Sequence, residues 1–238
     1  MSALRLLEVR ASMGARLDIQ VTPARVGGWV WSELPLAKKA RNGRLPPLLP
    51  ERVRGRWLAE IRRRHPFVLS RRQFPTIVPL EEYEISRWVT DLVQQHRDSP
   101  RDSLWYRDLC ATLERQGWVD SHGGRHSSPE EVEGFLSGYM LPLIASIEQH
   151  GFDPGRTTDT GWALLGANGQ VLKTKRATHR FFIARALGVP TFPLQVAAVH
   201  VDWWRRVFPG SRRAGHPILG WEDRLEAALA RVSAEHSD

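Results

Sequence analysis

The chain contains one cysteine, few lysines and no long apolar run. Cys110 alone cannot form an internal disulfide, which fits a reducing cytoplasm, the compartment we expect. No stretch of eighteen apolar residues occurs, so we expect no membrane-spanning helix. The residues that follow Met1 lack the long apolar core of a signal peptide. These shortages favour a globular protein that works away from the membrane.

Arginine and tryptophan are plentiful instead. Ten Trp and a hydrophobic fraction of 42% can build the core of one large domain, with or without an extension, in 238 residues. Residues 1–75 hold 16 Lys and Arg against 5 Asp and Glu, whereas residues 76–238 hold 18 against 21. Such asymmetry indicates a polyanionic partner, such as nucleic acid, for residues 1–75. A solvated basic face in an arginine-rich chain also accounts for it.

Residues 1–75 are expected to form a basic N-terminal extension that Pro and Gly interrupt. The alternation over residues 16–22 predicts a strand, and Lys38–Arg44 is a basic sequence typical of a loop. A helix is expected after Pro50, because Val53, Trp57 and Ile61 recur at a spacing of four.

Residues 76–238 are expected to form one α+β domain with a small mixed sheet flanked by helices. Ser128 starts a capping-box sequence, and Pro142 within the helix that follows predicts a kink near Gly138. Residues 120–127 are expected to form a polar loop. Asn168-Gly169 predicts a β-hairpin. The expected helices are 81–96, 102–116, 128–151, 179–187 and 221–232, and the expected strands are 162–165, 171–174 and 192–199.

The segment Arg176-Ala177-Thr178-His179-Arg180 stands where a strand is expected to pass into a helix. Backbone N–H groups at a helix N-terminus lack intrahelical partners, and the helix dipole attracts anions there. Thr178, His179 and Arg180 add donors, and Lys173 and Lys175 add charge from the preceding strand. This pattern predicts a phosphate site, although Thr178 as a simple helix cap is the alternative explanation.

Three motifs in this part of the chain resemble the ParB/sulfiredoxin-like superfamily. The first is Asn168–Leu172, which contains the expected hairpin. The second is Thr178–Pro190, which begins with a His-Arg box and ends in Leu-Gly-Val-Pro. The third is Phe192–Val196. The Ser146–Gly151 helix end resembles the helix that precedes the family's first strand. Val199–Trp203 is similar to the ending of members found in polysaccharide-biosynthesis gene clusters. The resemblance spans about Pro79 to Trp204.

The resemblance implies that His179 and Arg180 contact nucleotide phosphates, and that Thr178 makes a hydroxyl or backbone contact at the same turn. Members of the superfamily include ATP-dependent sulfiredoxins, CTP-binding chromosome-segregation proteins and free-serine kinases. It therefore implies ATP or another nucleoside triphosphate, with Mg²⁺, as cofactors. Sulfiredoxin chemistry needs a cysteine in the box, where this chain has Thr178, so we do not expect that reaction. The Glu-Arg-Arg box of the CTP-binding members is also absent, and Ala177 replaces the usual glycine of the His-Arg box.

By resemblance to the serine kinases, a carboxylate near the start of the domain would act as the catalytic base, with His179 beside the phosphates. Glu82 is our preferred candidate, Glu81 and Glu84 are the alternatives, and Asp159 is a further candidate. The acids at residues 81–84 also complement a helix dipole. His200 and Trp203 are expected at the mouth of a substrate pocket, or at the edge of the core. His122 and His126 have a spacing that metal sites share with many chance pairs, and we expect no metal-ligand cluster.

The resemblance favours a cytoplasmic, ATP-dependent kinase that acts on a small hydroxylated substrate. The alternatives are a ParB-like nucleic-acid-binding protein or nuclease that uses residues 1–75, and a non-catalytic member that binds a partner protein. No helix-turn-helix pattern follows the His-Arg box, which weakens the nucleic-acid alternative.

Overall fold

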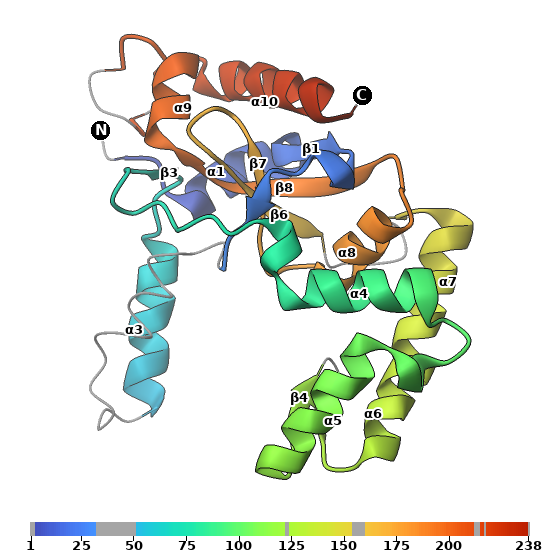
Figure 1. Cartoon of the computed structure of the whole chain (residues 1–238). Coiled ribbons are helices and arrows are strands. Elements are labelled where there is room, and N and C mark those ends of the chain that lie inside the picture. Colours follow the sequence, from blue (N-terminus) through green and yellow to red (C-terminus); the bar gives the residue numbers. More distant parts are fainter. Residues whose placement is uncertain are drawn as a thin grey trace.

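The structure is a computed structural model that describes residues 3–31, 51–121, 124–153, 160–211, 215–216 and 218–237. The expected basic loop at Lys38–Arg44 lies outside these residues. The fold belongs to the expected α+β class, with a six-stranded mixed sheet that carries helices on both faces (Figure 1). A small two-stranded sheet lies apart from it.

The main sheet has the strand order β1-β8-β6-β7-β2, and β3 also pairs with β8. Neighbouring strands run parallel in the pairs β6–β8, β2–β7 and β3–β8, and antiparallel in β1–β8 and β6–β7. The strands are β1 (Asp18–Val21), β2 (Gly28–Trp29), β3 (Val68–Leu69), β6 (Gly161–Leu165), β7 (Val171–Lys173) and β8 (Phe192–His200).

Strand β8 is the centre of this sheet. Eight of its nine residues are buried, which a nearly continuous apolar run allows when helices cover both faces of a sheet. One edge pairs with β6, and the other pairs with β1 along its first half and with β3 at its last two residues. The end of β8 at His200 is therefore held between two strands.

The N-terminal part of the chain is not a separate extension. Strands β1, β2 and β3 all come from residues 1–75 and pair with β7 or β8. Arg16 also forms ion pairs with Asp223 (2.7 Å) and Glu226 (2.6 Å) near the other end of the sequence. The expected boundary near residue 75 therefore falls inside one sheet, because pairing partners distant in sequence leave no local signal. Part of the local excess of positive charge is neutralised by acids of the C-terminal helix.

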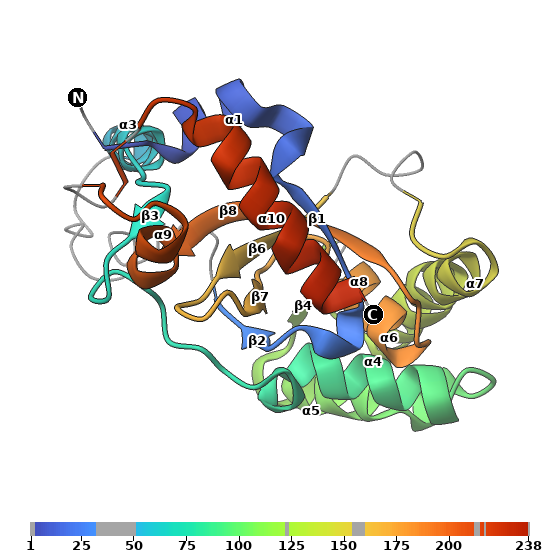
Figure 2. The ribbon, with the colours of Figure 1, turned by 90° about the horizontal axis from the view of Figure 1, so that it is seen from above.

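Helices α10 and α8 lie on opposite faces of the sheet, and α4 packs against α8 (Figures 1 and 2). Helix α3 projects away from the sheet and is seen end-on in Figure 2. The α-helices are α1 (Leu6–Met13), α3 (Glu51–Arg63), α4 (Glu84–Gln95), α5 (Leu104–Gln116), α6 (Pro129–Phe135), α7 (Leu141–His150), α8 (Thr178–Ala186), α9 (Val201–Val207) and α10 (Trp221–Ser237). Short 3₁₀ turns are η1 (Gly14–Leu17), η2 (Pro23–Arg25), η3 (Leu80–Glu82) and η4 (Pro100–Asp102).

The boundaries of the helical region follow from its caps. The side chain of Ser128 accepts a hydrogen bond from the backbone N–H of Glu131, as expected for the start of α6. A π-helical turn, η5 (Leu136–Met140), separates α6 from α7. Its position agrees with the kink predicted near Gly138, because Pro142 cannot donate the backbone hydrogen bond of a regular helix. Helix α5 ends at Gly117, whose φ of 77° is left-handed.

Two hairpins differ in how well the sequence predicted them. The expected hairpin at Asn168-Gly169 is confirmed, with β6 and β7 antiparallel and a φ of 88° at Gly169. The expected polar loop over residues 120–127 is instead a second hairpin, β4 (Val119–Ser121) and β5 (Gly124–His126). Its strands are short and mostly polar, so they show no hydrophobic alternation that sequence reasoning could detect.

Candidate functional site

The turn between β7 and α8 has an unusual backbone. Ala177 is the residue before the helix, with φ 50° and ψ 38°, and its side chain offers no cap to the helix. Among the described residues, it is the only one other than glycine with a positive φ. A left-handed conformation favours glycine over residues with a Cβ. Ala177 therefore holds a backbone conformation that glycine would adopt at a lower steric cost.

Two side chains hold the turn from within. The ammonium of Lys173 is fully buried and donates hydrogen bonds to the carbonyl oxygens of Thr174 (2.5 Å) and Arg176. It also lies 5.6 Å from the ring centre of Trp29, close enough for a cation–π contact. The Thr178 hydroxyl donates to the carbonyl of Lys175. The Lys173 ammonium therefore stabilises the turn from its buried side. Lys173 does not line the cavity described next, whereas the sequence led us to expect that it contacts a phosphate.

The outer side of the turn opens onto a cavity of about 440 Å³. Lys175, Thr178, His179 and Arg180, which the sequence analysis grouped as a phosphate site, line it together. Arg176, Ile85 and Tyr139 also line the cavity, and the sequence analysis gave these three residues no binding role. The lining residues are Ile85, Tyr139, Lys175, Arg176, Ala177, Thr178, His179 and Arg180. Three of these are cationic, and none of them is acidic.

Aromatic rings fix the orientation of two lining residues. The His179 ring lies edge-on to Trp105, with 5.4 Å between ring centres, and 6.1 Å from Tyr139. The Arg176 guanidinium lies 4.3 Å from the ring centre of Trp162, which Arg10 also contacts at 3.6 Å. Packed aromatic rings therefore hold the side chains of His179 and Arg176 in place. This reduces the side-chain conformational entropy that would be lost when a ligand binds.

A smaller cavity of about 110 Å³ adjoins the first, because Arg180 lines both. Its other walls come from the end of α7 and the segment just after it. Its lining residues are Leu143, Ser146, Ile147, His150, Gly151, Phe152, Asp153 and Arg180. Sequence reasoning noted the Ser146–Gly151 motif only as part of a resemblance and gave it no role, because periodicity alone does not show which helix end faces a turn distant in sequence.

The two expected catalytic acids lie outside both sets of lining residues. The carboxylate of Glu81 accepts a hydrogen bond from Arg185 (2.8 Å), which also donates to the carbonyl of Pro23. Glu82 is an exposed residue of the turn η3. Both acids precede α4 as expected, but the residue of this region that reaches the larger cavity is Ile85. The further candidate Asp159 lies outside the described residues.

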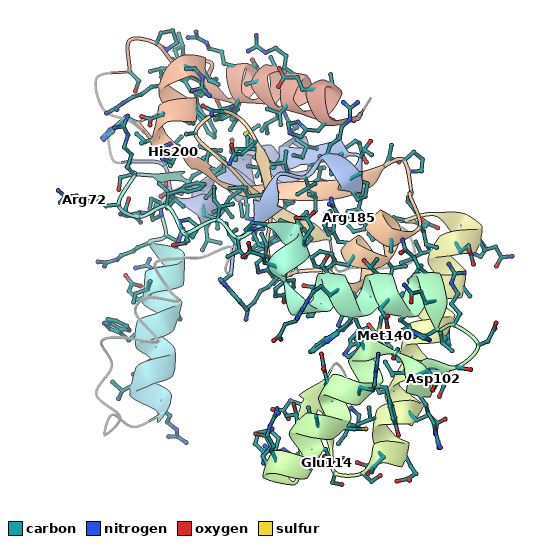
Figure 3. The ribbon with its side chains drawn as sticks, viewed as in Figure 1. Arg72, Asp102, Glu114, Met140, Arg185 and His200 are labelled. Carbon is teal, nitrogen blue, oxygen red and sulfur yellow. The ribbon has the colours of Figure 1, made fainter. Side chains whose placement is uncertain are left out.

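His200 and Trp203 belong to the opposite end of the molecule. Figure 3 shows His200 on the opposite side of the sheet region from Met140 of the turn η5. The His200 ring packs on Phe74, with 4.9 Å between centres, and burial lowers the pKa of this imidazole below its ordinary value. Trp203 is 5% exposed and packs against Gly169 of the hairpin. Of the two alternatives expected for these residues, the edge of the core describes their packing, and neither residue lines the two cavities.

No ready-made metal cluster occurs in the part of the chain that the structure describes. Groups of three or more His, Cys, Asp or Glu side chains that could hold a metal ion are absent there. His126 bonds to the hydroxyl of Ser121 (2.5 Å), and His122 lies outside the described residues. Within the same residues, no helix combines the length and hydropathy that crossing a bilayer requires.

Comparison with known proteins identifies no relative: no family model, curated protein or solved structure matches the chain. The function proposed below therefore rests mainly on the geometry of the two cavities.

Proposed function

We propose that the larger cavity binds the phosphate groups of a nucleoside triphosphate, and that the protein is an ATP-dependent phosphotransferase with a small hydroxylated substrate. One observation carries this proposal. The left-handed residue Ala177 turns the chain so that the start of α8 and three cationic side chains line one cavity.

Charge and dipole both favour a phosphate at this turn. The first N–H groups of a helix have no partner within the helix, and its dipole gives them partial positive charge. Lys175, Arg176 and Arg180 add three full charges, and hydrogen bonds between such groups and phosphate are among the strongest in proteins. No acidic residue is among the described residues that line the larger cavity.

The rest of the cavity suits the remainder of a nucleotide. Ile85 and Tyr139 provide an apolar and aromatic wall against which a base or ribose can pack. A volume of about 440 Å³ is within the range of small-molecule sites. The resemblance of the His-Arg box to nucleotide-binding members of the ParB/sulfiredoxin-like superfamily supports the same ligand class.

Phosphoryl transfer depends mainly on positioning and on neutralising the charge of the phosphates. Mg²⁺ commonly binds through substrate phosphates, water and one or two carboxylates. Asp153 in the adjoining cavity is the carboxylate among the described lining residues that could contribute one such ligand. The ion would supply charge neutralisation, while Lys175 and Arg180 hold and orient the phosphates.

The test is a thermal-shift panel with ATP, CTP, GTP and UTP, each with and without Mg²⁺. A ligand that binds only the folded state raises the melting temperature, and at 100 times its Kd it adds about 2.7 kcal/mol. We expect ATP with Mg²⁺ to give the largest shift and to be consumed when an alcohol is added. The absence of a shift with all four nucleotides would refute the proposal.

Nucleic-acid binding is a second candidate, which the geometry of α3 favours. This helix projects from the sheet (Figure 1) with Arg52, Arg56 and Arg63 exposed. Phosphate contacts make DNA binding fall steeply with salt. We expect any DNA binding to weaken strongly between about 50 and 200 mM salt and to be lost when Arg52 and Arg56 become Gln. Binding that neither salt nor these changes affects would exclude α3 as the contact.

A further inference from the structure

The smaller cavity has the size and chemistry of a subsite for a small polar molecule. The cavity has a volume of about 110 Å³, about a quarter of the larger one, which suits a group of only a few non-hydrogen atoms. Its walls are mixed: Leu143, Ile147 and Phe152 are apolar, whereas Ser146 and Asp153 offer polar atoms. Such a lining can hold the carbon chain of an alcohol and its hydroxyl at the same time.

His150 is an exposed residue that lines this cavity, and a local hydrogen bond orients its ring. Its Nδ1 lies 3.1 Å from the carbonyl oxygen of Ser146, one turn earlier in α7. Because a carbonyl only accepts, Nδ1 carries the proton in this hydrogen bond. In the neutral ring, Nε2 then keeps its lone pair as an acceptor. An imidazole oriented in this way is a common form of general base.

Arg180 connects the two cavities. It lines the larger one beside His179 and the smaller one beside His150. A phosphate held in the larger cavity is thereby adjacent to whatever occupies the smaller one. Adjacent sites for a phosphate and a hydroxyl are what phosphoryl transfer requires, because much of its barrier is removed by holding the reactants together.

We propose that the smaller cavity binds the hydroxyl-bearing end of the acceptor substrate, and that Nε2 of His150 accepts the hydroxyl proton. This inference rests on the proposed phosphotransferase function. The hydroxyl oxygen forms a bond to the terminal phosphorus of the triphosphate while the bond from that phosphorus to the bridging oxygen breaks. The nucleoside diphosphate leaves with that electron pair, and the proton passes to His150. Glu81 and Glu82 are not needed in this step.

The acceptor class is a short-chain alcohol, or a molecule with such a group at its end. The test therefore uses ethanolamine, glycerol, glycolate and serine, whose two- and three-carbon chains differ in charge. Release of ADP from ATP with Mg²⁺ is measured with each alcohol. We expect His150→Ala to lower alcohol-dependent release by about 100-fold or more, the usual contribution of a general base, and added imidazole to restore part of it.

His236 provides a matched control. Like His150 it lies in the last turn of a helix, with Nδ1 2.8 Å from the carbonyl oxygen four residues earlier, that of Val232. It belongs to α10 on the other face of the sheet and lines neither cavity. We expect His236→Ala to leave ADP release unchanged, and both variants to keep the thermal shift that ATP causes.

A second measurement does not depend on nucleotide. The same alcohols are titrated into the ¹⁵N-histidine-labelled protein, and the imidazole nitrogen signals are followed by NMR. A change at His150 but not at His236 supports the subsite even if no nucleotide binds, in which case only the phosphotransferase function fails. If ATP binds but no alcohol changes the His150 signals, the subsite is refuted and nucleotide binding stands. Full alcohol-dependent turnover by His150→Ala also refutes the role of His150.

Discussion

Two strand-to-helix turns of this protein each carry a histidine, but the starts of the two helices are capped differently. At the junction of β8 and α9, His200 is the helix cap, and its Nδ1 accepts a hydrogen bond from the backbone N–H of Asp202 (3.1 Å). Arg71 pairs with the Asp202 carboxylate at 2.9 Å. The start of α9 is therefore closed by its own side chains.

At the junction of β7 and α8, the cap position is Ala177, which has no polar atom to offer. Lys173 and Thr178 bond to carbonyl oxygens of the turn, and the cationic residues that follow β7 face a cavity. A histidine at the end of a strand therefore does not indicate a site by itself. The residue at the cap decides whether the helix start is closed or offered to a ligand.

The closed junction should respond to substitution with the largest loss of stability. Trp203→Ala removes a buried indole that packs α9 on the hairpin turn at Gly169. We expect the free energy of unfolding to fall by about 3–5 kcal/mol, as for other buried aromatic residues. Urea unfolding measures this fall, and the nucleotide affinity of the folded fraction should not change.

The control for this change is Trp57→Ala. Trp57 lies on α3 and is 39% exposed, so less packing is lost. We expect less than about 1 kcal/mol, as for most surface substitutions. A loss of nucleotide affinity in Trp203→Ala, at unchanged stability, would instead place Trp203 in the binding site.

The stability of the region around β3, which pairs with the last two residues of β8, should also fall in acid. His65, next to the segment that forms β3, is buried, and desolvation lowers its pKa from 6.5 to about 4. Between these values the unfolded chain binds a proton that the folded chain does not, so stability is complete above pH 6.5 and falls as the pH drops toward 4. The full effect is about 3 kcal/mol.

Urea unfolding at pH 7.5 and pH 4.5 measures this loss in the protein and in His65→Gln. Glutamine keeps a hydrogen-bond donor for the Pro66 carbonyl but does not titrate in this range. The difference between the two proteins isolates His65, because the other titrating groups are shared. Equal pH dependence in both proteins would show that His65 is accessible to protons in the folded state.

Substitutions at the junction of β7 and α8, the open junction, should lower ligand affinity and not mainly stability. Arg180→Gln removes one charged donor from the lining of both cavities. Hydrogen bonds to charged groups contribute about 1.5–3 kcal/mol, so we expect nucleotide affinity to fall roughly 10- to 100-fold, measured by titration calorimetry. Arg205→Gln on α9 is the control, because Arg205 is an exposed residue of the closed junction. A similar loss in both variants would indicate nonspecific charge attraction.

How well sequence reasoning worked depended on how local each signal is. The hairpin at Gly169 and the cap at Ser128 are each determined by a few neighbouring residues, and both were predicted. Pro142 predicted a kink near Gly138, and a π-helical turn lies there. The membership of β1 and β3 in the sheet depends on pairing with β8 over more than a hundred residues. The hydrophobic periodicity within residues 1–75 does not show that these segments pair with β8.

The same distinction holds for the candidate site. Lys175, Thr178, His179 and Arg180 are adjacent in sequence and meet at one cavity. Lys173 belongs to the same segment, but the strand turns its side chain inward, and burial could not be deduced from its charge. His150 and Tyr139 reach the cavities only because α7 and η5 pack near α8, and tertiary packing of this kind has no signature in a single sequence.

The smallest expected effect concerns the residue that distinguishes the two junctions. Ala177→Gly relieves the steric cost of a Cβ in the left-handed region, about 1–2 kcal/mol, but adds about 0.5–1 kcal/mol of chain entropy to the unfolded state. We expect a net stabilisation of up to about 1 kcal/mol. Nucleotide affinity should hold or increase, since glycine keeps the turn and allows a phosphate closer approach. Chemical unfolding and calorimetric titration measure the two effects.

Ala186→Gly, in the last turn of the same helix, is the matched control. Its backbone is helical, so glycine brings the entropic cost without relieving strain, and we expect a loss of about 1 kcal/mol. The opposite signs of the two substitutions separate backbone strain from a general effect of glycine. If Ala177→Gly also destabilises the protein, the left-handed turn is not the resting conformation of this junction, and the open helix start on which the phosphate site depends is lost with it.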